Sequence, residues 1–331
     1  MKRDRPSLWA ALTTGVLVNV LLRSQSAYWP RAGALAALVC APLLAAAAWV
    51  FARAWRAGQS PLLRLLFAAL LAYSAALELL HFWALTQRLY TGLPLTVVCL
   101  MLLLPGVYLR RVSAISQTAH VVLCLLLLAS GFMLLTVLPR LRVTNLQTFA
   151  LQPADLLTAA QEQLTLYPEY LLSALWPQRG RQKRCPLLRL ALAALWFDVG
   201  IHLVLELFYG AALPLRVDPV HAAARCGALS VFNRLESLQL ALWVMALALK
   251  LALYFYAACL LLGQTRQQAN AVPLRRYPLY LGGMWALCLL LRNADLDAAL
   301  QARGAFVWGF AALTGMGGAA AWLCRKTKRC T

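Results

Sequence analysis

The chain has 331 residues, of which 62% are hydrophobic and only 13% charged, and its formal net charge is +20. Soluble domains average about 25% charged and roughly 45–50% apolar residues, so this composition excludes an ordinary water-soluble fold. The basic residues lie in short clusters between apolar runs. That pattern is typical of a membrane protein and argues against a nucleic-acid-binding protein, which needs its cations on one exposed face.

Apolar runs bounded by Arg, Pro and Gly predict about ten membrane-spanning helices, since one crossing needs roughly 20 apolar residues. In chain order the predicted spans are 8–22, 32–52, 62–84, 93–109, 114–138, a broken one at 153–177, 186–209, 234–262, 277–291 and 304–323. Strands are not expected, because the runs lack the alternation of a barrel strand. The whole chain, 1–331, is therefore expected to form a single all-α transmembrane domain in the lipid bilayer.

The distribution of Lys and Arg predicts the orientation of these spans. With a cytoplasmic N-terminus, 20 of them fall in inner segments and 10 in outer segments, Arg303 among the latter, while Lys250 falls within a span. Cytoplasmic loops carry the excess of positive charge. Both termini are therefore expected to be cytoplasmic.

The spans divide into two groups of five, at about 8–138 and 153–323, and the first span of each group is irregular. The first contains Gly15 and Asn19, and the sixth contains Pro168, which removes a helix donor. Interrupted segments at matching positions of two halves point to a transporter-type binding site. This pattern predicts that the first and sixth spans are broken helices, one in each group of five. A surface helix followed by a short span is the alternative at the sixth position.

Two segments resemble one known family. The stretch 233–250 begins with Asn-Arg-Leu-Glu-Ser-Leu and ends at Lys250, and Tyr167-Pro168-Glu169 interrupts the sixth span. The first is similar to the eighth helix, and the second to the broken sixth helix, of the spore-germination permeases, the B subunits of germinant receptors. We expect Arg234 and Glu236 to form a polar group near the outer face.

The resemblance implies the inverted-repeat fold of the amino acid–polyamine–organocation superfamily. It implies a non-catalytic subunit that senses a small nutrient, typically an amino acid, in the inner membrane of a dormant spore. It also implies two partners, a larger membrane subunit and a lipoprotein. No cofactor or metal is expected, because the sequence has no cluster of Cys and His with zinc spacing. The expected ligand-binding pocket lies among the first, third, sixth and eighth spans and is lined by Thr14, Gly15, Tyr73, Pro168, Glu169 and Ser237.

Two other functions remain open from the sequence. One is a proton-coupled amino acid transporter of the same fold. The other is a membrane-embedded lipid-linked transferase, for which Asp155 and Asp218 on the two longer outer loops are the acids available. No metal or nucleotide motif accompanies these acids.

Lys250 lies near the middle of a long apolar run. A charge at mid-membrane costs at least ~2.5 kcal/mol on insertion scales, so it should face a partner or a water-filled cavity. Asp198 lies at a similar depth, which predicts a Lys250–Asp198 pair, either a proton-coupling or gating contact or an ion pair that only packs helices together. Glu78 and His81 share a helix face, where we expect a polar contact, because a metal site needs more ligands.

Overall fold

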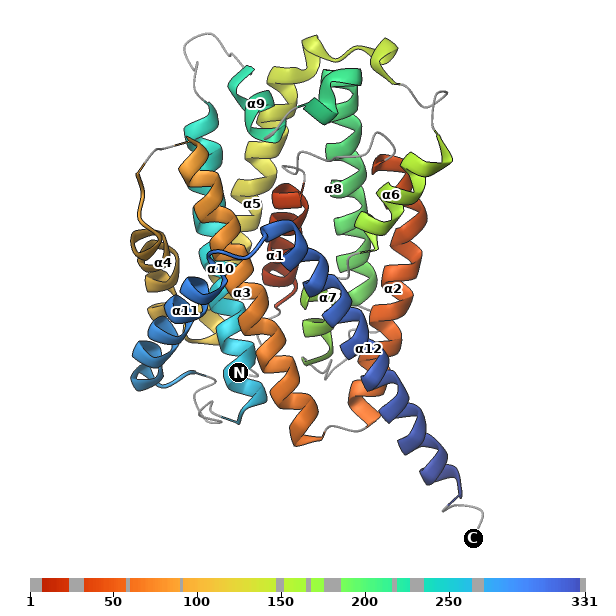
Figure 1. Ribbon diagram of the computed structural model, residues 1–331, viewed down its shortest axis with the longest axis vertical. Coiled ribbons are helices and arrows are strands. Elements are labelled where there is room, and N and C mark those ends of the chain that lie inside the picture. The colour runs from red at the N-terminus through yellow and green to blue at the C-terminus, as the bar shows by residue number, and fades with distance from the viewer. Residues whose placement is uncertain are drawn as a thin grey trace, which may run out of the picture.

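The computed structural model describes residues 8–23, 33–57, 60–89, 92–146, 152–164, 168–175, 186–215, 219–226, 235–263 and 271–327. Over these ranges the chain is all-helical and forms one bundle (Figure 1). The longer helices are α1 (Trp9–Arg23), α2 (Gly33–Ala57), α3 (Pro61–Leu89), α5 (Val112–Val137), α8 (Pro186–Tyr209), α10 (Leu235–Leu261), α11 (Tyr277–Leu291) and α12 (Leu296–Thr327). The shorter ones are α4 (Leu95–Leu103), α6 (Pro153–Gln163), α7 (Pro168–Leu172) and α9 (Pro219–Cys226), with 3-10 turns η1 (Leu104–Val107), η2 (Leu138–Arg140), η3 (Val143–Asn145), η5 (Ser173–Leu175), η6 (Gly210–Leu215) and η7 (Leu274–Arg276).

Among the described residues, five helical stretches are long and apolar enough to cross a membrane. They are Gly33–Arg56, Pro61–Arg88, Val112–Arg140, Leu190–Leu213 and Leu240–Leu261. Their outward faces carry large apolar side chains, such as Leu128, which is 70% exposed. Apolar faces of this extent suit lipid rather than water. The structure thus supports the prediction of an all-helical, multi-pass membrane protein.

Helix α1 lies in the middle of the bundle, where it contacts α5, α8, α10 and α7. On one side α3 packs against α10, α11 and α12, and on the other α2 packs against α8, α6 and α12 (Figure 1). The central helix therefore has protein on several sides. Its residues from Ala10 to Val20 are all buried, including the polar Thr13, Thr14 and Asn19.

The sixth predicted span is interrupted, as expected from its proline. Helix α6 ends at Gln163 and α7 begins at Pro168, with Leu164 in a turn after α6. A proline is tolerated at the first position of a helix, where the missing N–H would have no partner within the helix. The interruption brings the residue after it, Glu169, into the interior, where it is 0% exposed.

The predicted break in the first helix is wrong for the described residues, because Trp9–Arg23 is one uninterrupted α-helix. The hydroxyls of Thr13 and Thr14 donate to backbone carbonyls one turn earlier, at 2.9 and 2.8 Å. Both polar side chains are thereby satisfied without unwinding the backbone. Gly15 lies within the helix, so its contribution is the absence of a side chain and not a break in the backbone.

The contact between α2 and α12 depends on Gly318. A Cβ at this position would lie 2.7 Å from Cα of Ala54, a backbone atom. We expect Gly318→Val to lower the free energy of unfolding by about 1–3 kcal/mol, the usual cost of overpacking. Thermal unfolding of the purified protein in detergent measures this. Gly317→Val is the matched control, because a Cβ there meets nothing within 4 Å. An equal loss in both variants would contradict the close approach.

Candidate functional site

Six polar side chains from five helices meet in the interior of the bundle, and we call them the ionic centre. None of them is more than 5% exposed. They are Asn19 on α1, Glu78 on α3, Glu169 on α7, Lys250 and Tyr254 on α10, and Arg303 on α12. Since Glu78 and Lys250 lie within two of the candidate spans, the centre sits at membrane depth.

The ammonium group of Lys250 is at the middle of this cluster. Its Nζ lies 2.7 Å from Oε1 of Glu78 and 3.4 Å from Oε1 of Glu169, and it donates a hydrogen bond to Oδ1 of Asn19. An ammonium has three donors, and three oxygens surround it here. The ring of Tyr254, one turn further along α10, lies 5.6 Å from the same Nζ. Lys250 therefore links α10 to α1, α3 and α7 at once.

The carboxylate of Glu169 is held from two sides. Asn19 donates from Nδ2 to Oε2 at 2.8 Å, and Tyr254 donates from Oη to Oε1 at 2.6 Å. The space for this carboxylate comes from Gly15, since a Cβ there would lie 2.9 Å from Cγ of Glu169. Asn19 bridges the two ions, because its carbonyl oxygen accepts from Lys250 while its amide nitrogen donates to Glu169. These opposite roles fix the orientation of the amide.

The carboxylate of Glu78 is shared between two cations. Its Oε1 lies 2.7 Å from Nζ of Lys250 and 2.9 Å from a guanidinium nitrogen of Arg303. Within the described part of the chain its Oε2 has no hydrogen-bond partner, and neither has Oγ of Ser74, one turn earlier on α3. Both atoms are buried, so the centre retains hydrogen-bonding capacity that its own six side chains do not use.

The charges of the ionic centre balance. Two carboxylates face two cations, and each ion lies within 3.4 Å of at least one of opposite sign. A buried ion is strongly destabilising when it lacks a partner, because it has lost its hydration. A neutral, paired cluster is therefore the form in which four ionisable groups can remain at membrane depth. The same balance makes the cluster sensitive to any added or removed charge.

The predicted pairing of Lys250 with Asp198 is wrong. The acidic partners of Lys250 are Glu78 and Glu169. Asp198 instead lies 3.1 Å from Nδ1 of His202, one turn further along α8. Equal depth in the membrane does not make two helices neighbours, and α1 lies between α8 and α10, in contact with both.

The six predicted ligand-binding residues meet only in part. Gly15 and Glu169 touch within the ionic centre, and Pro168 begins the helix that carries Glu169. Thr14 is buried within α1 and bonded to its own helix. Tyr73 is half-buried, and its hydroxyl donates a 3.1 Å hydrogen bond to the carbonyl of Ala299, which lies one turn before Arg303. Tyr73 thus anchors the start of α12.

Some predicted residues lie outside what the structure describes. These are Arg234 and Asp218, together with the side chains of Ser237 and Glu236. Asp155, the other acid considered for a transferase, is in the first turn of α6. The predicted outer-face group of Arg234 and Glu236 stays a prediction.

Four members of the ionic centre escaped prediction in this role: Asn19, Glu78, Tyr254 and Arg303. The placement of Arg303 in an outer segment is wrong, because α12 begins at Leu296 and Arg303 is only 5% exposed. For Tyr254 a signal existed, because residues four apart share a helix face and Lys250 precedes it by four. For Arg303 the sequence offers no comparable signal, since its partner is on another helix.

Gly15 offers a direct test of the close contact between α1 and α7. We expect Gly15→Ala to lower the free energy of unfolding by about 1–3 kcal/mol, because the new methyl group meets a buried carboxylate that cannot move away freely. Thermal unfolding in detergent is the measurement. Gly131→Ala on α5 is the control, since a Cβ there meets nothing within 4 Å. If Gly15→Ala proves as stable as that control, Glu169 does not occupy the position described.

Comparisons with protein-family models and with curated proteins find no match to this chain. Two segments distant in sequence, one around Pro168 and one ending at Lys250, meet where Glu169 and Lys250 lie 3.4 Å apart. The candidate site is a charge-balanced cluster buried in a helical membrane protein, beside an interrupted helix.

Proposed function

We propose that this chain is the membrane subunit of a spore germinant receptor, which senses a small nutrient such as an amino acid. One observation supports the proposal above the others. The two segments that resemble the spore-germination permeases each contribute an ion to the ionic centre, Glu169 from one and Lys250 from the other. Ionisable residues that meet at membrane depth are candidates for a functional site.

The chemistry of the centre suits a zwitterion. An amino acid carries an ammonium group, which Glu78 and Glu169 attract, and a carboxylate, which Lys250 and Arg303 attract. Because the cluster is neutral and internally paired, a zwitterion can exchange ion pairs with it without adding net charge to the interior. Such an exchange weakens the contacts that Lys250 makes to α1 and α7. In this proposal the nutrient signal is the resulting movement of these helices.

The proposal includes an architecture of about ten spans in a 5+5 inverted repeat, with both termini cytoplasmic. The interruption between α6 and α7 supports it, because broken helices at mid-membrane depth carry the sites of such folds. The receptor would lie in the spore inner membrane with a larger membrane subunit and a lipoprotein. Since α1 is uninterrupted, the proposal retains only the interruption before Pro168 of the two that were predicted.

A thermal-shift screen of the purified full chain against single amino acids tests the proposal. A ligand at about 100 times its dissociation constant stabilises by roughly 2.7 kcal/mol, so a binding amino acid should raise the melting temperature measurably. Glu169→Gln should abolish the ligand-induced shift, and Asp198→Asn should leave it intact. If every amino acid leaves the melting temperature unchanged, the proposed ligand class is wrong.

A proton-coupled amino acid transporter is the second candidate. The observation that favours it is the sharing of one ammonium between two buried carboxylates, Glu78 and Glu169, since buried acids form proton relays in transporters. Uptake of the identified amino acid into liposomes, driven by a pH gradient, separates the two functions. The sensor predicts binding without uptake, and the transporter predicts uptake that collapses when the gradient is removed.

A further inference from the structure

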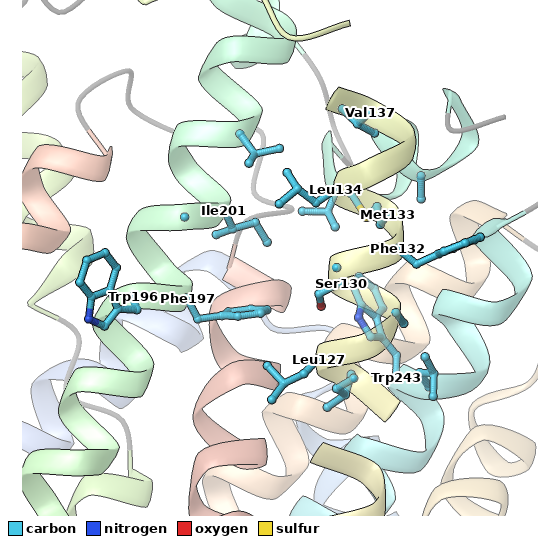
Figure 2. A pocket seen from close by; sticks show the side chains of 18 residues that line it. Leu127, Ser130, Phe132, Met133, Leu134, Val137, Trp196, Phe197, Ile201 and Trp243 are labelled. Carbon is cyan, nitrogen blue, oxygen red and sulfur yellow. The ribbon is translucent and has the colours of Figure 1, made fainter. Parts of the chain in front are cut away.

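A second feature lies away from the ionic centre, on the flank of the bundle. Helices α5 and α8 both pack on α1, and an apolar groove of about 280 Å³ separates them. Figure 2 shows its lining side chains, with Trp196, Phe197 and Ile201 on one side and the α5 residues opposite them. Among the described residues that line it, Ser130 has the only polar side chain apart from the indole N–H groups.

The groove faces the bilayer rather than the interior. Both α5 and α8 contribute candidate membrane spans. The rim residues are exposed, with Leu127 50%, Leu134 39% and Trp196 75% accessible. A volume of about 280 Å³ is near the lower end of small-molecule sites, which begin at ~300 Å³. The groove therefore suits one hydrocarbon chain entering sideways from the lipid.

Two glycines keep the groove open. Gly131 on α5 and Gly200 on α8 both line it, and a Cβ built at either meets no atom within 4 Å. Close helix packing in membranes uses small residues to bring backbones together. Here the two glycines face open space instead of another helix. They therefore widen the groove and do not bring two helices together.

Cations lie at the upper end of the groove. Val137 lines it there, and the exposed Arg140 and Arg142 follow within the next turns. The backbone N–H of Arg142 donates to the carbonyl of Leu207 at 3.0 Å, which holds this segment across the end of α8. Glu206 is an acid near this end of α8. It follows the lining residue Val204 by two positions, so its side chain is rotated by about 200° around the helix axis from that of Val204. Two exposed guanidinium groups therefore follow the apolar slot within five residues of Val137, its last lining residue on α5.

We propose that this groove binds one acyl chain of an anionic phospholipid, with the lipid phosphate on Arg140 and Arg142. The slot supplies the apolar contact, and the two guanidinium groups match a phosphate, which Arg binds in a bidentate manner. The bound lipid ties α5 to α8 around α1, the helix that carries Asn19. This inference stands independently of the proposed nutrient site.

Native mass spectrometry of the full chain in detergent, titrated with dioleoyl phosphatidylglycerol or dioleoyl phosphatidylcholine, tests the assignment. We expect a 1:1 complex with phosphatidylglycerol that is at least about tenfold tighter than that with phosphatidylcholine. The double variant G131L/G200L fills the slot and should weaken binding of both lipids by about tenfold or more. G282L/G283L is its matched control, because these α11 glycines also face open space and lie outside the groove.

The headgroup contact has its own variant. R140Q/R142Q should remove the preference for phosphatidylglycerol and leave the binding of phosphatidylcholine nearly unchanged, whereas the exposed control R275Q/R292Q should keep the preference. The proposal is overturned if G131L/G200L binds phosphatidylglycerol as tightly as the unmodified chain. It is also overturned if R140Q/R142Q keeps the preference for phosphatidylglycerol.

Discussion

Lys250→Met is expected to lower the free energy of unfolding by about 3–5 kcal/mol, the usual effect of removing one partner from a buried ion cluster. Methionine replaces the length of the side chain but not its charge. Glu169 then remains in the interior with hydrogen bonds from Asn19 and Tyr254 but no cation. We expect little folded protein after expression and a large drop in melting temperature in detergent. Asp198→Asn serves as the control, since Asp198 lies outside this cluster.

Two double variants show which charge matters. Lys250→Met with Glu169→Gln leaves Glu78 paired with Arg303 at 2.9 Å, so this combination should recover most of the lost stability. Lys250→Met with Glu78→Gln leaves the buried Glu169 without the cation that lies 3.4 Å from it. It should recover much less. Equal recovery in both would mean that only the net charge matters and that the described pairs do not.

The positions of the helices were largely predictable, because each depends on a local apolar run. The predicted spans 186–209 and 277–291 coincide with α8 and α11 at both ends. The start of α12 was missed, since the prediction began at 304 and the helix begins at Leu296. An apolar run stops at a charge, whereas a helix continues through it when the charge has a buried partner, as Arg303 has in Glu78.

The ionic centre was predictable only in its parts. The cost of a mid-membrane charge singled out Lys250, whereas Glu78 was expected only to make a polar contact with His81. Which groups meet depends on how the helices are placed around one another, and a residue's depth along its own helix carries no such information. Asn19 lies 231 residues from Lys250 in the sequence, and only the central position of α1 brings them together.

A single aromatic cluster joins three helices, and Phe310 on α12 lies within it. Its ring centroid is 5.7 Å from that of Phe51, 5.2 Å from that of Phe67 and 6.3 Å from that of Trp55. All four side chains are at most 1% exposed. They connect α2, α3 and α12 on the side of the bundle away from α5, and so support the helix that carries Arg303.

Phe310→Ala is expected to cost about 3 kcal/mol in free energy of unfolding, the lower end of the range for Phe→Ala in a core. The lower end applies because lipid is as apolar as the protein interior, so the loss comes from the cavity and missing dispersion contacts rather than from hydration. Phe306→Ala, one turn earlier on the same helix, is the matched control, since Phe306 is 38% exposed. Its loss should stay below about 1 kcal/mol, as for substitutions outside a packed core. Thermal unfolding of both variants in one detergent decides the point, and similar losses would show that the cluster does not hold α12 against α2 and α3.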